Sequence, residues 1–242
     1  PPPPPPLFFF KQNTAYAIGV RLVGSDMCIR DSPSERGTVV LPGTVGGGDW
    51  AGGAVDVETG WLYIPSHTKP DVVVLDRTVD EFGDSTYFAW RNRTLHGPQG
   101  LPLTKPPYSR ITAIDLKSGD HMWMAPTGTG PVNHPVLKLL DALPPLGSGG
   151  RFFVLATPTA LLVTAEHTQW LPGGGYPFEV DPERYLWAYD LEDGRVLARL
   201  TLPGNATGNP MTYSVDGRQF IAIPTNLPGP GGPAGITVLA LP

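Results

Sequence analysis

A short pattern, A-x-D-x-x-[T/S/D]-G, recurs three times in this chain and constrains its fold more than any other feature. The copies are AVDVETG from Ala54, AIDLKSG from Ala113 and AYDLEDG from Ala188. In each copy the Asp carboxylate can accept backbone N–H groups where the chain leaves a strand, and the Gly supplies the positive φ of a turn. Because an apolar run follows each copy, the pattern predicts three β-hairpins with one turn chemistry.

Other segments also predict short strands. PMTYSVDGRQFIAIP predicts a fourth hairpin that turns at Asp216-Gly217, a favoured type I′ pair. FFVLATPTALLVTAE is apolar but is interrupted by Pro158, so it predicts two strands. The closing ITVLALP predicts a final strand, and VLKLLDAL, within the insertion 131–150, predicts two turns of helix.

The composition agrees with an all-β fold. Thirty glycines and thirty prolines disfavour long helices. The three copies start 59 and 75 residues apart (113 − 54 and 188 − 113), which is more than a bare four-stranded sheet needs, so we expect insertions such as Lys69–Pro107. Repeated hairpins are typical of a β-propeller. A β-sandwich is the alternative, but it does not explain three matching hairpins.

The charge excludes some partners. The net charge is −5 and there is no basic block, so nucleic acid and anionic membranes are poor partners. The sequence also lacks an unbroken run of about 18 apolar residues, the length of a membrane-spanning helix.

The stretch Gly37–Ser66 joins a glycine-rich turn to the first hairpin and is the strongest candidate for a binding site. Asp49 and Trp50 are the only bulky side chains in GGGDWAGG. Bare backbone can pass close to a ligand, and a flat aromatic ring beside a polar acceptor suits a planar ligand. The alternative is a tight β-turn in which Trp50 belongs to the ordinary core.

Residues 1–32 resemble translated sequencing-adapter DNA rather than a folded segment. The resemblance rests on RLVGSDMCIRDS, residues 21–32, and on KQNTAYA, residues 11–17. A proline-rich linker is the alternative. We expect residues 1–32 to be an artefact of the sequencing library and residues 33–242 to form the folded domain. The single cysteine, Cys28, falls in the excluded segment, so no disulfide or cysteine metal site is predicted.

The second copy carries a family resemblance. AIDLKSGDHMW, Ala113–Trp123, fits the propeller repeat A-x-D-x-x-[T/S]-G-x-x-x-W of the pyrroloquinoline quinone (PQQ) dehydrogenases. Over most of residues 37–242 the chain resembles the quinoprotein glucose and alcohol dehydrogenases, through the glycine-rich stretch, NHPVLK and PMTYSVDGRQFIAIP. The resemblance implies the C-terminal blades of an eight-bladed propeller of roughly twice this length. It also implies that Trp123 docks its blade against the next, a contact weakened in the third copy by Ala198.

The resemblance implies a chemistry as well. In the family, PQQ and Ca²⁺ lie near the propeller axis, an aspartate takes the substrate hydroxyl proton, and hydride passes from the substrate to the quinone, which Ca²⁺ polarises. Electrons then leave to ubiquinone or a cytochrome. The base and the calcium ligands are expected upstream, in a missing N-terminal half, so no catalytic or metal-binding residue is assigned here. We expect a periplasmic sugar or alcohol dehydrogenase, and a fragment that is inactive alone.

By resemblance, Asp49 and Trp50 are assigned to cofactor binding. The family usually has Asn-Trp at this turn, and the Asn amide contacts the rim of PQQ. The Asp49 carboxylate accepts but cannot donate, and it would face the acidic groups of PQQ. This departure favours the alternative function, a non-enzymatic propeller scaffold that shares the repeat and binds no quinone.

The five histidines show no spacing typical of a metal site. They are expected on the surface or in loops. His67, which follows WLYIPS at a predicted strand end, is the one that could face the propeller axis.

Overall fold

The computed structural model describes seven ranges of the chain, namely 34–44, 46–48, 51–77, 87–140, 142–166, 184–227 and 232–240. The predicted adapter segment 1–32 lies outside them. The chain divides into two compact units, residues 1–39 with 72–92, and residues 40–71 with 93–242. The helices in these described ranges are two 3-10 turns, η1 (Pro98–Gly100) and η2 (Leu137–Leu139). Neither has the length or hydropathy needed to cross a bilayer.

The first unit is built on a three-stranded sheet. Its strands are β1 (Thr38–Val40), β4 (Asp71–Arg77) and β5 (Tyr87–Thr94), in the order β1-β4-β5. The insertion 69–107 was expected from the spacing of the repeats, and it does separate two paired strands of the other unit. Its two strands were not predicted, because the polar stretch between them dominates the local composition. The apolar run of DVVVLDR has the β-branched residues that favour a strand.

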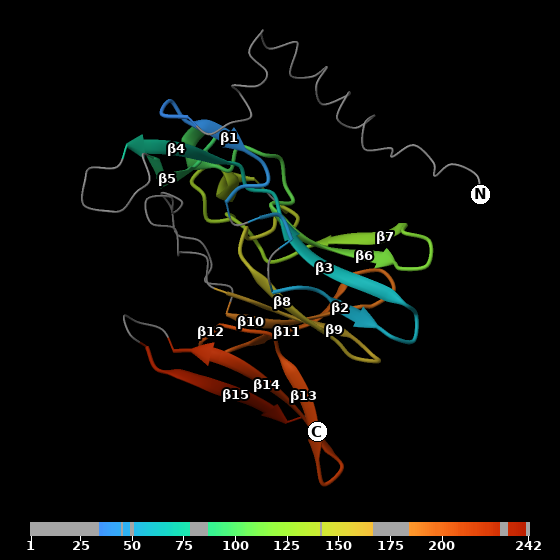
Figure 1. Ribbon diagram of the computed structural model, residues 1–242. Coiled ribbons are helices and arrows are strands. Elements are labelled where there is room, and N and C mark those ends of the chain that lie inside the picture. Colours follow the sequence, from blue (N-terminus) through green and yellow to red (C-terminus); the bar gives the residue numbers. More distant parts are fainter. Residues whose placement is uncertain are drawn as a thin grey trace, which may run out of the picture. The chain divides into compact units, whose positions relative to one another are not determined.

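The second unit contains three antiparallel sheets that follow one another along the chain (Figure 1). Sheet one has the order β2-β3-β6-β7, and sheet two has the order β11-β10-β9-β8. In sheet three, β14 pairs with β12 and β13 along one edge and with β15 along the other. Their bounds are β2 (Ala54–Asp56), β3 (Trp61–His67), β6 (Ser109–Asp115), β7 (His121–Pro126), β8 (Phe152–Ala156), β9 (Leu161–Ala165), β10 (Tyr185–Tyr189), β11 (Val196–Thr201), β12 (Asn205–Ala206), β13 (Met211–Val215), β14 (Arg218–Asn226) and β15 (Ala234–Ala240).

Successive antiparallel sheets of this kind are the blades of a propeller. The all-β prediction is confirmed, and sheets one and two are four-stranded units in chain order, as a partial propeller requires.

Sheet two lies at the centre of the packing, because both of its faces are buried. One face packs on sheet one in a cluster that includes Phe152, Leu161 and Tyr63. The other face packs on sheet three in a cluster that includes Phe153 and Ile223. Two buried faces explain why β8 and β9 read FFVLA and LLVTA, apolar runs without polar alternation. The prediction of two strands in this segment is confirmed.

The three copies of the repeat adopt the same turn. The N–H two residues after each Asp donates to its carboxylate, at 3.0 Å for Asp56, 2.7 Å for Asp115 and 2.9 Å for Asp190. The N–H of the Gly four residues after each Asp donates to that Asp's carbonyl, at 2.9, 2.7 and 3.1 Å. The φ angles of these glycines are 75°, 81° and 71°. The turn chemistry predicted from the pattern is therefore confirmed.

The copies differ in their place within a sheet. The first joins β2 to β3, the first two strands of sheet one, whereas the others join the third and fourth strands of sheets one and two. The pattern encodes a turn, and the same turn serves two positions in a sheet.

Two more local predictions have opposite outcomes. Asp216 and Gly217 have φ angles of 50° and 78°, which confirms the type I′ hairpin between β13 and β14. The predicted two-turn helix in VLKLLDAL is wrong, because the chain forms only η2 and is extended again at Leu140. The Leu139 side chain is 76% exposed, so this segment lacks the packing that stabilises a short helix.

Candidate functional site

The glycine-rich turn, residues 43–53, lies along the edge of β3. Gly48 forms an antiparallel bridge with Ser66, and the His67 N–H donates to the Gly47 carbonyl at 2.8 Å. Farther on, Ala54 pairs with Tyr63. Between these two pairings, β3 spans three residue positions (66 − 63), whereas the turn spans six (54 − 48). The turn has more residues than the edge of β3 can pair.

The beginning of the turn is held by a buried carboxylate. The Thr44 N–H and hydroxyl both donate to Asp71, at 2.9 and 2.7 Å. Asp71 is only 2% exposed, so these hydrogen bonds form where the local dielectric constant is low and are stronger than they would be in water. The Gly43 N–H donates to the Lys69 carbonyl at 3.0 Å. These contacts fix the start of the turn against the chain that leaves β3.

The end of the turn is held by other contacts. The Asn209 side-chain amide donates to the Ala51 carbonyl at 3.2 Å. A Cβ at Gly53 would lie 2.7 Å from the Tyr63 carbonyl oxygen, so only glycine lets the backbone approach β3 this closely. The turn is therefore anchored on both sides of its central pair.

The central pair itself, Asp49-Trp50, lies outside the described residues, and its assignment to cofactor binding stays a prediction. The structure describes Gly48 before it and Ala51 after it. His67 is buried at the end of β3, where its backbone holds the turn. The anchoring residues were missed in the sequence because Thr44 and Asp71 lie 27 residues apart, and no local pattern links them.

The described part of the turn fits a planar cofactor such as PQQ in one respect, its open backbone. A Cβ at Gly52 would meet nothing within 4 Å, and one at Gly46 would meet only the Gly48 carbonyl oxygen, at 3.5 Å. Both glycines have positive φ, at 77° and 86°. Calcium is a different case. In the described ranges no group of three or more His, Cys, Asp or Glu side chains is placed to hold a metal ion.

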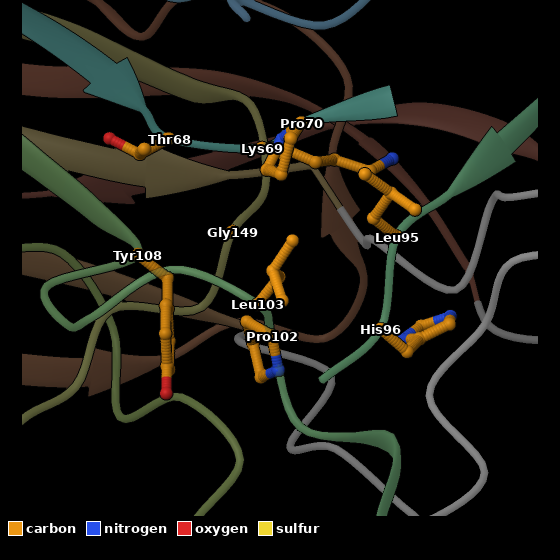
Figure 2. Close-up of a pocket in the computed structure, with 9 residues that line it drawn as sticks. All are labelled: Thr68, Lys69, Pro70, Leu95, His96, Pro102, Leu103, Tyr108 and Gly149. Carbon is orange, nitrogen blue, oxygen red and sulfur yellow. The ribbon is translucent and has the colours of Figure 1, made fainter. Parts of the chain in front are cut away.

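Figure 2 shows the residues that line a pocket where the chain leaves β3. The pocket adjoins the turn through Lys69, whose carbonyl accepts from Gly43. Burial lowers the pKa of the half-buried Lys69, an effect that the nearby Asp71 charge opposes. Burial also raises the pKa of Tyr108. Lys69 and Tyr108 thus line a pocket whose walls are largely apolar. Its lining is Thr68, Lys69, Pro70, Leu95, His96, Pro102, Leu103, Tyr108 and Gly149.

Trp123 joins sheet one to the repeat turn of sheet two, as predicted. Its indole N–H donates to the Leu191 carbonyl at 2.9 Å, and the Tyr63 hydroxyl donates to the same oxygen at 3.2 Å. Burial, and next the Asp56 charge, raises the pKa of Tyr63 to about 12, so this hydroxyl is a weaker acid than that of an ordinary tyrosine. Ala198, at the corresponding position of the next copy, is an exposed residue of β11.

Comparison with known proteins gives three findings. The sequence profile of the family described as "PQQ: Glucose/ethanol/alcohol dehydrogenase, beta-propeller domain" matches residues 24–221. The glycerol dehydrogenase large subunit of Gluconobacter oxydans is 31% identical over 217 residues, which are 78% of this chain and 27% of that protein. The quinoprotein glucose dehydrogenase of Escherichia coli is 28% identical over 213 residues, or 79% of this chain and 25% of that protein.

Among solved structures, the quinohemoprotein alcohol dehydrogenase of Comamonas testosteroni has a TM-score of 0.49 and 18% identity, covering 84% of this chain and 25% of that one. The chain spans about a quarter of the length of the curated relatives that it matches.

Proposed function

The chain belongs to the glucose/ethanol/alcohol dehydrogenase β-propeller family of PQQ proteins, and from this membership we propose that it forms the C-terminal part of a PQQ-dependent sugar (glucose-type) or alcohol dehydrogenase. The match of the family profile over residues 24–221 is the observation that carries the proposal. The contact of Trp123 with the next sheet supports it, because inter-blade docking is what the repeat of this family implies.

In this proposal PQQ lies against Asp49 and Trp50. When bound, PQQ supplies the acceptor for the hydride that a substrate C–OH loses on oxidation. The chain's own contribution is to hold the turn still, through the Thr44 bonds to Asp71 and the Asn209 bond to Ala51. Because these contacts order the turn before PQQ binds, less of the binding free energy is lost in ordering it.

The partners in this proposal follow from the family. The substrate is a sugar or alcohol, and the relatives named for glycerol and glucose support that class. The base and the ligands of Ca²⁺ belong to the part of the protein that precedes this chain. Electrons pass to ubiquinone or a cytochrome, and the protein works in the periplasm.

Reconstitution of the full-length protein tests the proposal. The gene is extended upstream from genomic DNA, and the purified protein is incubated with PQQ and Ca²⁺ and assayed by dye reduction with glucose, glycerol and ethanol. We expect turnover of at least one substrate by the full-length protein and none by residues 33–242 alone. Equilibrium dialysis with PQQ distinguishes the proposed dehydrogenase from the alternative, a propeller scaffold. The scaffold would bind no PQQ even when correctly folded.

A further inference from the structure

A half-buried lysine lines the pocket at the end of β3 (Figure 2). Within the described ranges, no hydrogen bond or ion pair holds the side-chain amine of Lys69. A charge that is partly removed from water is costly unless another group compensates it. The Lys69 amine is therefore a group that a ligand of opposite charge would stabilise.

The carboxylate closest to Lys69 in the sequence does not fill this role. Asp71 lies two residues on, but its Oδ2 accepts two hydrogen bonds from Thr44, at 2.9 and 2.7 Å. Burial outweighs the attraction of the Asp71 charge, so the pKa of Lys69 stays below its ordinary value of 10.5. Asp71 holds the glycine-rich turn, and the charged form of Lys69 remains disfavoured by its surroundings.

The other walls of the pocket are mostly apolar. They include Pro70, Leu95, Pro102, Leu103 and the buried Tyr108. Leu103 is 55% exposed, which places it at the open mouth. Counted out to this mouth, the pocket has a volume of about 340 Å³, at the low end for ligand sites. The space suits a molecule of a few heavy atoms rather than a large cofactor.

Backbone contacts hold the segments around the pocket together. The Thr68 N–H donates to the Tyr108 carbonyl at 2.8 Å, and the Tyr108 N–H donates to the Leu146 carbonyl at 2.8 Å. His96 forms an antiparallel bridge with Pro102. These contacts exist without a ligand, so binding would spend little free energy on ordering the walls.

We propose that this pocket binds a short-chain monocarboxylate, with the carboxylate against the Lys69 amine and the alkyl carbons against Leu95 and Leu103. An ammonium donates charge-assisted hydrogen bonds to a carboxylate. An alkyl chain suits the apolar walls, whereas phosphate or a dicarboxylate would bring further charge against them. All the lining residues belong to the described part of the second unit, and the proposal does not depend on PQQ.

Lysine acylation measures occupancy of the pocket without any substitution. The full-length protein is treated briefly with an N-hydroxysuccinimide acetate ester at mildly alkaline pH, over a range of butyrate concentrations. Mass spectrometry then gives the modified fraction at each lysine. Butyrate is expected to slow acylation of Lys69 severalfold, because a paired ammonium releases its proton less readily. Lys117, which is exposed, is the internal control and should react at the same rate throughout.

A ligand series and two variants separate the contributions of charge and alkyl chain. Affinity is measured by ligand-observed NMR titration. Acetate is expected to bind more weakly than butyrate, by about fourfold for each buried methylene that it lacks. Lys69→Met keeps the length of the side chain but removes the charge, and it is expected to weaken butyrate binding about tenfold. Lys117→Met is the matched control and should leave the affinity unchanged.

Three results would overturn the proposal. The first is acylation of Lys69 at one rate with and without butyrate. The second is equal butyrate affinity in the wild type and in Lys69→Met. The third is binding of 1-butanol as tight as that of butyrate, which would mean that the amine takes no part. If Lys69→Met does not fold, acylation of the wild type decides by itself.

Discussion

At the scale of single residues, Gly194 and Gly119 form a matched pair. Both close the same repeat turn with positive φ, 71° and 81°. A Cβ at Gly119 would meet nothing within 4 Å, whereas one at Gly194 would lie 2.5 Å from Cε3 of Trp123. The two glycines therefore share a backbone constraint, and only Gly194 also has a packing constraint.

Substitution by alanine separates these constraints. Gly119→Ala is expected to lower the free energy of unfolding by about 1–2 kcal/mol, the strain of a left-handed L-residue. Gly194→Ala is expected to lower it by a further ~1–3 kcal/mol, because the new methyl group displaces the indole. Urea unfolding followed by tryptophan fluorescence measures both. Equal losses would mean that Trp123 moves aside freely and that its docking contributes little.

The resemblance described in the sequence analysis implies an Asn at the position of Asp49. Restoring an amide with Asp49→Asn is expected to tighten PQQ binding about tenfold, because one side-chain donor replaces an acceptor that faces an acidic cofactor. Equilibrium dialysis of the full-length protein against PQQ, at fixed Ca²⁺, gives the dissociation constant. An unchanged affinity would show that PQQ does not contact this side chain, and a weaker one would contradict the expectation that an amide is the better partner.

At the scale of elements, the repeat turn depends on a carboxylate that favours its ionised form. The Thr59 hydroxyl donates to Asp56 at 2.7 Å, and the Glu58 N–H donates at 3.0 Å. These bonds, the first of them above all, hold the pKa of Asp56 below its ordinary value of 3.8. The unfolded chain therefore takes up this proton at a higher pH than the folded protein does. The stabilisation is complete above pH 3.8 and is lost as the pH falls through the lower folded pKa.

Two variants test this dependence. Asp56→Asn removes the titration, so its loss of stability relative to the wild type should be larger near neutral pH than at about pH 2. Thr59→Ala removes the hydrogen bond that lowers the pKa of Asp56 most, so acid should destabilise that variant less steeply than the wild type. The measurement is the urea midpoint across the acid range. Parallel curves for all three proteins would contradict the assignment.

The elements that the sequence predicted are those set by local chemistry. In the turn at Asp190 the donor to the carboxylate is the N–H of Glu192, two residues on, so the seven-residue pattern contains the interaction. At Asp216-Gly217 both positive φ angles follow from the residues themselves. The helix predicted in VLKLLDAL failed because its stability depended on packing that a local pattern does not report.

The candidate site was predictable only in part, for the same physical reason. The glycines around Asp49 and Trp50 are visible in the sequence, and the cofactor site there stays a prediction. Its anchors are contacts between residues far apart, Thr44 with Asp71 and Ala51 with Asn209. Such pairs have no spacing rule, so they appear only when the sheets are in place.

At the scale of the whole molecule, the chain spans about a quarter of its relatives' length, and one edge of its last sheet has no partner strand in the described ranges. Among the described residues, β15 pairs only with β14. Two of its apolar side chains, Ile236 and Val238, are 69% and 47% exposed. An apolar edge strand of seven residues is a template for pairing with another chain. We therefore expect the chain to self-associate through β15 when it is expressed alone.

A lysine on that edge tests the expectation against ordinary surface hydrophobicity. Ile236→Lys is expected to reduce the self-associated fraction of the isolated chain severalfold, since charged edge residues oppose strand pairing. Leu139→Lys is the matched control, because Leu139 is 76% exposed but lies in the 3-10 turn η2 rather than on a sheet edge. Sedimentation velocity at several protein concentrations measures the fraction. If both lysines reduce association equally, apolar exposure in general is the cause, and the edge of β15 has no special part in it.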